Sequence, residues 1–331
     1  FTVGSGVTLT IRGSSSGTLS AYQDHTGQIN CNASVEFIRT SGTVILESGN
    51  ISAETYVSGN DTGSFDKGAD GYSDPLGVAV KSGGRFVQNG GAVNVKSYLH
   101  LSPRGTVNTS TDPVVYIRLK GIVIDSGGTG EMNAGTLDIS SDAGVKNNGR
   151  EDKRIEHYSY AIVNEGSFTF NGGTITHWAQ SRSTKKPRVT HYQYIFAGSK
   201  SPVITGGNAT STISRDGSPG STTWVHQAIE TNSYIDAYGN TVSNVSGANG
   251  GSPTSHGGQT FISGGTPYSG STVLRIEYDY LGTITSSPNA NIGTVTVSSN
   301  AGWKSAVTNP STGSQIYNVA NGANITINPI V

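Results

Sequence analysis

A motif of eleven residues recurs four times along this chain and constrains its fold more than any other feature. The copies read GTVILESGNIS from Gly42, GRFVQNGGAVN from Gly84, GTGEMNAGTLD from Gly128 and GSFTFNGGTIT from Gly166. Each copy opens with a glycine, carries a second glycine at its eighth position and has an aliphatic residue at its tenth. Successive copies start roughly 40 residues apart, which is a period typical of solenoids and propellers.

Apolar residues alternate with polar ones within and just before each copy, as in VAVKSGG at 78–84 and AIVNEG at 161–166. Such alternation predicts strands with one buried face, and the glycines can supply the positive φ of sharp corners. Gly130 is the exception at the third position, where the other copies have Val or Phe. We therefore predict that the third and tenth positions face a common interior, namely Val44, Ile51, Phe86, Val93, Leu137, Phe168 and Ile175.

The uneven spacing of the copies, with long insertions such as 55–76 and 177–200, favours a solenoid over a four-bladed propeller. Loops can protrude from one coil of a solenoid without disturbing its neighbours, whereas a propeller needs four regular strands per blade. We predict an all-β fold, a β-solenoid (β-helix) with long inserted loops. It would form a single elongated domain over residues 1–331, with its clearest coils at 42–180 and less regular coils at 201–331.

Helix is expected at one place at most. The segment TTWVHQAIE at 222–230 has apolar residues four positions apart, so it is the only plausible helix, although a strand remains the alternative. Elsewhere toward the C-terminal end, segments such as STVLRIEYDY at 271–280 and GTVTVSS at 293–299 alternate in the manner of strands.

The composition narrows the class of protein. Only 13 % of the residues are charged and the formal net charge is −1, so a partner nucleic acid is not expected, because its binders usually carry a basic domain. Disorder is not expected either, since it normally comes with high net charge and few β-branched residues. Cys31 is the only cysteine, so no intramolecular disulfide can form. No apolar run is long enough for a membrane-spanning helix. The first residue is Phe1, which suggests a piece of a longer precursor.

The pattern AI-x-N-x-G-x-F-x-x-N-G-G-x-I, read from Ala161, resembles the coils of bacterial surface β-solenoids of the pectate-lyase-like superfamily. In particular, the chain resembles the binding region of serine-rich repeat adhesins from lactobacilli, most clearly over residues 42–180. The resemblance implies a right-handed parallel β-solenoid on a secreted protein at the bacterial cell surface, anchored to the cell wall through other segments. It also implies a role in cell adhesion and host colonisation, through carbohydrate binding to host or plant polysaccharides.

Solenoids of this shape are often polysaccharide lyases or hydrolases, so an enzyme acting on pectin-like uronic-acid polymers is the alternative. A glycoside hydrolase needs two carboxylates flanking the scissile bond, yet the chain contains no Asp-Asp pair. The richest acidic stretch, NDTGSFDKGADGYSD at 60–74, could hold a hard cation through Asp61, Asp66, Asp70 and Asp74. Its spacing matches no ligand pattern, so a solvated loop is the simpler interpretation. We expect no catalytic residues, no metal and no cofactor.

The most unusual local composition is HWAQSRSTKKPRVTHYQY at 177–194, which is basic and aromatic and has no acidic residue. We expect it to leave the solenoid as a loop and to meet a second insertion, NNGREDKRIEHYSY at 147–160. Arginine binds carboxylates bidentately and lysine offers a compact charge, while aromatic rings can pack on sugars. The candidate ligand-binding residues are Arg182, Lys185, Lys186, Arg188, Trp178, Tyr192, Tyr194, Arg150, Lys153 and Arg154. The alternative is a solvated loop that only aids solubility.

These residues would suit an acidic polysaccharide such as polygalacturonate, or mucin and epithelial glycans, bound by a monomer without cleavage. His157, His177 and His191 flank the two basic segments. An unperturbed histidine titrates near ~6.5, whereas acidic sugars stay ionised well below that pH. We therefore predict pH-dependent binding that strengthens as the pH falls from 7 to about 5.

Overall fold

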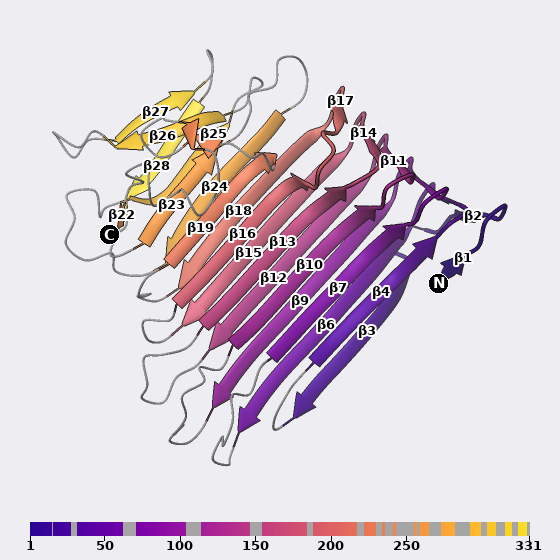
Figure 1. The fold of residues 1–331 in the computed structure, drawn as a ribbon, viewed down its shortest axis with the longest axis horizontal. Coiled ribbons are helices and arrows are strands. Elements are labelled where there is room, and N and C mark those ends of the chain that lie inside the picture. Colours follow the sequence, from indigo (N-terminus) through magenta and orange to yellow (C-terminus); the bar gives the residue numbers. More distant parts are fainter. Residues whose placement is uncertain are drawn as a thin grey trace.

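Three parallel sheets wind into stacked coils in the computed structural model (Figure 1). It describes residues 1–14, 16–27, 32–61, 71–103, 114–145, 154–183, 188–216 and 222–229, and the short strands from β20 to β28. In each coil the chain passes through one strand of sheet A, a short strand of sheet B and a long strand of sheet C. Six coils follow one another in this way, from β1–β3 to β16–β18. The predicted right-handed parallel β-solenoid is confirmed.

The strands of each sheet are as follows. Sheet A contains β1 (Thr2–Val3), β4 (Asn32–Thr40), β7 (Gly71–Val80), β10 (Val114–Ile124), β13 (Arg154–Asn164), β16 (Arg188–Ala197), β19 (Thr222–Ile229), β23 (Gln259–Gly264) and β22 (Ser255–His256). Sheet B contains β2 (Thr8–Ile11), β5 (Thr43–Leu46), β8 (Arg85–Gln88), β11 (Thr129–Met132), β14 (Ser167–Phe170) and β17 (Val203–Ile204). Sheet C contains β3 (Thr18–Gly27), β6 (Asn50–Asp61), β9 (Ala92–Pro103), β12 (Thr136–Val145), β15 (Thr174–Ser183), β18 (Asn208–Asp216), β24 (Val273–Leu281), β25 (Ile292–Ser298) and β28 (Asn324–Pro329).

Parallel pairing changes to antiparallel pairing toward the C-terminal end. The described strands of the six coils pair in parallel and in register, as β10 does with β13 and β7. β19 still pairs in parallel with β16 and β23, as β24 does with β18. Antiparallel pairs follow, as between β24 and β25 and between β25 and β28. The remaining strands form two-stranded antiparallel sheets, β20 (Tyr234–Ile235) with β21 (Thr241–Val242) and β26 (Trp303–Thr308) with β27 (Gln315–Val319). The described C-terminal strands are thus β-structure of a less regular kind.

The repeat positions face the interior as predicted. Each of the seven predicted inward residues is at most 1 % exposed, namely Val44, Ile51, Phe86, Val93, Leu137, Phe168 and Ile175. The glycine at the eighth position of each copy has a positive φ, between 66° and 92°, in the region that L side chains rarely adopt. This column of glycines forms the corner between sheets B and C.

The exception at Gly130 has a packing explanation. In sheet B Gly130 lies between Phe86 and Phe168, and an added Cβ there would lie 2.9 Å from the Phe168 ring and 2.6 Å from Cδ1 of Ile124. The aromatic rings of the neighbouring coils fill the space that a side chain at this position would need. A larger residue would overpack the interior.

Two predictions about local structure are wrong. The described part of the chain contains no helix, and the segment expected as a possible helix forms β19, which pairs with β16 and β23. Hydrogen bonding to two neighbouring strands outweighs a weak helical spacing. The long insertions are also mostly strand: β15 continues to Ser183 and β16 begins at Arg188, so only residues 184–187 separate them.

Candidate functional site

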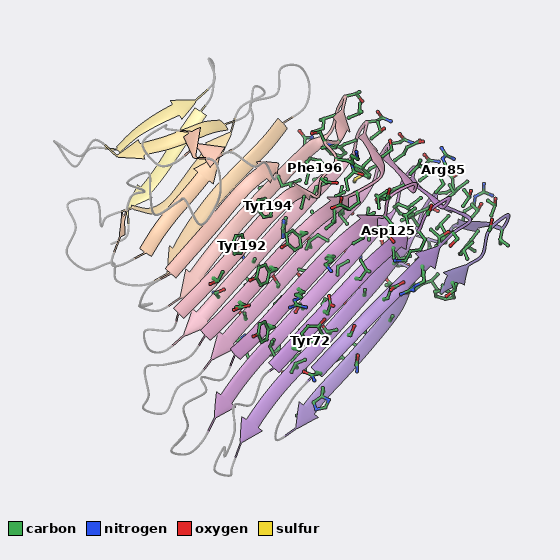
Figure 2. The ribbon with its side chains drawn as sticks, viewed as in Figure 1. Tyr72, Arg85, Asp125, Tyr192, Tyr194 and Phe196 are labelled. Atoms are coloured by element: carbon green, nitrogen blue, oxygen red, sulfur yellow. The ribbon has the colours of Figure 1, made fainter. Side chains whose placement is uncertain are left out.

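The outer face of sheet A carries a group of tyrosines that no single segment of the sequence reveals. On β7, β10, β13 and β16 the inward residues alternate with outward ones, as the pleat of a strand requires. Register then places outward residues of successive coils side by side, so that Tyr72 pairs with Tyr116 and Tyr158 with Tyr192. We call the following residues the sheet-A face: Tyr72, Asp74, Tyr116, Arg118, Lys120, Glu156, Tyr158, Tyr160, Tyr192 and Tyr194. Figure 2 shows Tyr72, Tyr192 and Tyr194 along the broad side of the solenoid.

The tyrosine rings of the fifth and sixth coils form two parallel stacks. The rings of Tyr158 and Tyr192 have centroids 5.3 Å apart and planes at 5°, and those of Tyr160 and Tyr194 lie 5.9 Å apart at 2°. Stacking covers one face of each ring, and Tyr194 is only 2 % exposed. A sugar therefore finds ring edges and one phenol hydroxyl per ring more readily than open ring faces. Tyr194 does not provide the stacking surface that the sequence suggested.

Two cations of β10 stand on this face without an ion-pair partner among the described residues. The exposed Arg118 has its Cζ 5.7 Å from the ring centroid of Tyr72 and 5.9 Å from that of Tyr116, within the range of cation–π attraction. Lys120, two residues further on, is partly exposed. These contacts position the exposed guanidinium of Arg118, which has five N–H donors and can bind a carboxylate.

The two carboxylates of the sheet-A face bind tyrosine hydroxyls. Tyr72 donates a hydrogen bond to Asp74, and burial together with this bond raises the pKa of Tyr72 to about 12. Tyr158 donates to Glu156 over 3.4 Å, and Glu156 is 8 % exposed. Arg118 and Lys120 therefore remain the charges on this face that are open to an acidic ligand.

The predicted site residues fall on both sides of the solenoid. Trp178 lies on the outer face of sheet C, whereas Tyr192 lies on the outer face of sheet A. The inner faces of these two sheets contact one another, as in the hydrogen bond between Ser141 and His157, so the outer faces point away from each other. One ligand surface cannot include both Trp178 and Tyr192 as they stand.

The structure does bring part of the predicted basic group together. Arg154 and Arg188 are register partners at the starts of β13 and β16, four residues before the stacked Tyr158 and Tyr192. Arg182 pairs with Gly144 in sheet C, near the ends of β15 and β12. The segments 146–153 and 184–187 thus join the same two sheets at the same edge in consecutive coils. The other four predicted cations lie outside the described residues: Arg150, Lys153, Lys185 and Lys186.

The three histidines expected to flank this site are in the interior instead. His157, His177 and His191 are each 0 % exposed. Burial lowers the pKa of all three, and each of His177 and His191 has a pKa of about 3. Neighbouring histidines lower the pKa of His157 and His177 further. The prediction that these residues charge between pH 7 and 5 and attract an acidic glycan is therefore wrong for all three.

The outer face of sheet C has a different character. The rings of Tyr56, Tyr98 and His100 form a stack, with centroids 4.6 Å and 4.0 Å apart. Nε2 of His100 lies 3.1 Å from Oδ1 of Asp142, an ion-pair distance without the alignment of a hydrogen bond. Lys96 is paired with Glu54 at 3.4 Å. Because Glu54 pairs with Lys96, the outer face of sheet C is a weaker candidate than the sheet-A face for binding an acidic ligand.

The acidic stretch divides between two strands. Asp61 ends β6 and Asp74 lies in β7, whereas Asp66 and Asp70 lie outside the described residues. Among the residues that the structure describes, no group of three or more histidine, cysteine, aspartate or glutamate side chains is placed to hold a metal ion.

The sequence contained a signal for the residues that the prediction missed. In VVYIRLK at 114–120, Tyr116, Arg118 and Lys120 share one phase of a strict alternation with buried Ile117 and Leu119. The pattern identifies an outward aromatic and basic row, but the position of this row beside Tyr72 and Tyr158 depends on register between coils.

No protein-family model, no curated protein sequence and no solved structure matches the chain. No helix in the described residues is long and apolar enough to cross a membrane.

Proposed function

We propose that this chain is the binding region of a bacterial cell-surface adhesin, which binds acidic polysaccharides or mucin-type glycans without cleaving them. The observation that carries the proposal is the sheet-A face, where Arg118 and Lys120 have no carboxylate partner among the described residues and stand beside tyrosine hydroxyls. Arginine and lysine bind carboxylates through charge-assisted hydrogen bonds, and hydroxyls can bind the neutral part of a sugar.

The geometry supports a ligand that extends along the solenoid axis. Neighbouring strands of a sheet lie about 4.8 Å apart, and Arg154 and Arg188 are register partners on β13 and β16. Arg118 lies on the preceding strand β10, four positions along from Val114, the partner of Arg154. An extended polymer with regularly spaced carboxylates could contact cations of several coils at once. Anchoring at the cell wall, through other parts of the protein, would present this face to host or plant material.

Binding would be tested with immobilised polygalacturonate, with a neutral galactan as the reference polymer. In Arg118→Glu/Lys120→Glu we expect the affinity for polygalacturonate to fall at least tenfold, because a hydrogen bond to a charged group contributes about 1.5–3 kcal/mol and ~1.4 kcal/mol corresponds to tenfold. The matched control is Arg12→Glu/Lys200→Glu, which reverses two exposed cations away from this face. A third variant, Lys185→Glu/Lys186→Glu, tests the contribution of the predicted basic residues between β15 and β16.

Two results would contradict the proposal. Unchanged affinity in both the Arg118/Lys120 and the Lys185/Lys186 variants would mean that the ligand binds elsewhere. Sustained release of unsaturated or reducing-end products from pectin by the wild-type chain would instead indicate a polysaccharide lyase or hydrolase.

A further inference from the structure

Inward positions change from apolar to polar between the fourth and fifth coils, and three of these changes introduce His157, Ser159 and His177. In the fourth coil Ile117, Leu119 and Ile139 are fully buried. Their register partners in the fifth coil are His157, Ser159 and His177, and these are equally buried. The backbone geometry of the two coils is the same, so only the chemistry of the interior differs.

The sixth coil continues this change. His191 and Gln193 follow His157 and Ser159 in sheet A, and Ser211 follows His177 in sheet C. We call these buried groups, with the two serines that contact them, the polar seam: Ser141, His157, Ser159, His177, Ser181, His191, Gln193 and Ser211. They lie between sheets A and C, on the side of the interior away from sheet B.

Hydrogen bonds link the polar seam across the two sheets. Nε2 of His157 lies 2.7 Å from Oγ of Ser141, and Nδ1 lies 3.2 Å from Oγ of Ser181. The His157 ring stacks on that of His191 with centroids 4.2 Å apart. Nε2 of His177 lies 2.5 Å from Oγ of Ser159.

Gln193 completes the network. Oε1 of Gln193 lies 3.1 Å from Nε2 of His191, at hydrogen-bond distance. Nε2 of Gln193 donates a hydrogen bond to Oγ of Ser211 over 2.9 Å. All of these partners are neutral.

None of the described side chains that face the polar seam can compensate a positive charge. The facing groups are Ser141 from β12, Ser159 from β13, Ser181 from β15, and Gln193 and Ser211 from β16 and β18, together with the histidines themselves. The nearest carboxylate along these strands, Glu156, occupies an outward position. A charge that is buried without a partner is strongly unfavourable, and two stacked histidines disfavour each other's protonation.

We propose that the polar seam is an acid-sensitive latch: protonation of its histidines parts sheets A and C around β13, β15 and β16, while the coils before it, whose described interiors contain no buried histidine, stay closed. Above pH ~6.5 the histidines are neutral both in the closed and in the open form, so the latch contributes its full stability. As the pH falls below ~6.5, the open form binds protons that the closed form resists. The opening equilibrium then rises by about tenfold per pH unit for each histidine that becomes accessible.

The second and third coils show why the effect should be local. Their interior also contains polar groups, since Ser73 lies 2.6 Å from both Thr55 and Ser97. Those hydroxyls do not titrate, so acid has nothing to protonate there. Both polar clusters are buried, and only the polar seam contains imidazole groups that can titrate.

The experiment is amide hydrogen exchange of the whole chain at pH 7 and pH 4.5, corrected for the intrinsic pH dependence of exchange. We expect the protection factors of the backbone amides in β13, β15 and β16 to fall by at least tenfold from pH 7 to pH 4.5, relative to those in β6 and β9. Equal changes in both sets of strands would overturn the proposal, as would an unchanged protection of β13, β15 and β16.

Two variants assign the effect to the histidines. Ser159→Leu/His177→Ile reproduces the interior of the fourth coil, where Leu119 and Ile139 occupy these positions, and should reduce the acid effect by about tenfold per pH unit. His100→Gln, which removes a histidine of the outer face, should leave the acid effect unchanged. A full acid effect in the double variant would contradict the proposal. Should that variant fail to fold, His157→Ile, which copies Ile117, provides the same comparison.

Discussion

The fourth and fifth coils of the solenoid are neighbours, but their interiors differ in chemistry. Both coils have the same three sheets and the same register, yet Ile117, Leu119 and Ile139 in one become His157, Ser159 and His177 in the next. In sheet B, by contrast, the buried residues of both coils are apolar, with Met132 in one and Phe168 and Phe170 in the other.

This difference shows that a solenoid backbone does not impose one kind of interior. Each coil contacts mainly its neighbours, so stability is approximately a sum of local contributions. An apolar column contributes through burial at every pH, whereas the polar seam contributes through hydrogen bonds that hold only while its histidines are neutral. Regions of equal burial can therefore respond differently to acid.

The largest expected effect on stability comes from the apolar side. Phe168→Ala removes a ring that is 1 % exposed and lies beside Gly130 and Phe196. We expect a loss of about 3–5 kcal/mol in the free energy of unfolding, measured by urea denaturation. The loss should be equal at pH 7 and pH 5, because no titratable group is removed.

The control for this variant is Val203→Ala, at an exposed position of β17, which should change the free energy of unfolding by less than about 0.5 kcal/mol. If Phe168→Ala left the stability unchanged, the inward assignment of the repeat would be wrong.

A second variant transfers the chemistry of the fifth coil into the fourth. Ile139→His places an imidazole between Val95 and the buried His177 in sheet C, so we expect a loss of about 2–4 kcal/mol at pH 7, from lost apolar burial and the cost of burying a polar group. The loss should grow toward pH 5, because the neutral histidine of the folded state gives way to a charged one in the unfolded state.

Ile139→Val is the matched control, with an expected loss of about 0.5–1.5 kcal/mol that does not depend on pH. A small and pH-independent effect of Ile139→His would mean that the two interiors are interchangeable. The comparison between the coils would then lose its physical basis.

The smallest effect is expected outside both interiors. Lys81 and Asp125 form an ion pair at 2.9 Å between the third and fourth coils, with side chains 34 % and 40 % exposed. Lys81→Ala should cost about 0.2–1 kcal/mol, and the cost should shrink in high salt because exposed charges are screened. Urea denaturation at low and high salt measures this loss in the free energy of unfolding. A loss above about 2 kcal/mol would show that surface ion pairs contribute as much as the interior does.

Much of the fold could be predicted because the repeat encodes it locally. Alternation identified the inward column from Val44 to Ile175, and the glycine at the eighth position identified the corner. The segment between 177 and 194 was harder, because its histidines, serines and glutamine look like residues of an exposed loop. Parallel pairing on both sides extends β15 and β16 through it, and polar residues then alternate into the interior.

The candidate site could be predicted only in part. The binding site inferred from charge and aromatic content remains a prediction. Register makes Arg154 and Arg188 strand partners, but the sequence could not separate Trp178 from Tyr192, which lie on opposite outer faces. It also passed over Arg118 and Tyr72, which are far apart in the chain and become neighbours through register.

The sequence by itself determined the class of fold, the repeat and its inward apolar positions, because periodicity and turn glycines act over a few residues. The tertiary structure alone decided which outward residues share a face and which histidines are buried. Both depend on the alignment of strands about 40 residues apart, and a shift of one residue in that alignment would exchange the inner and outer faces.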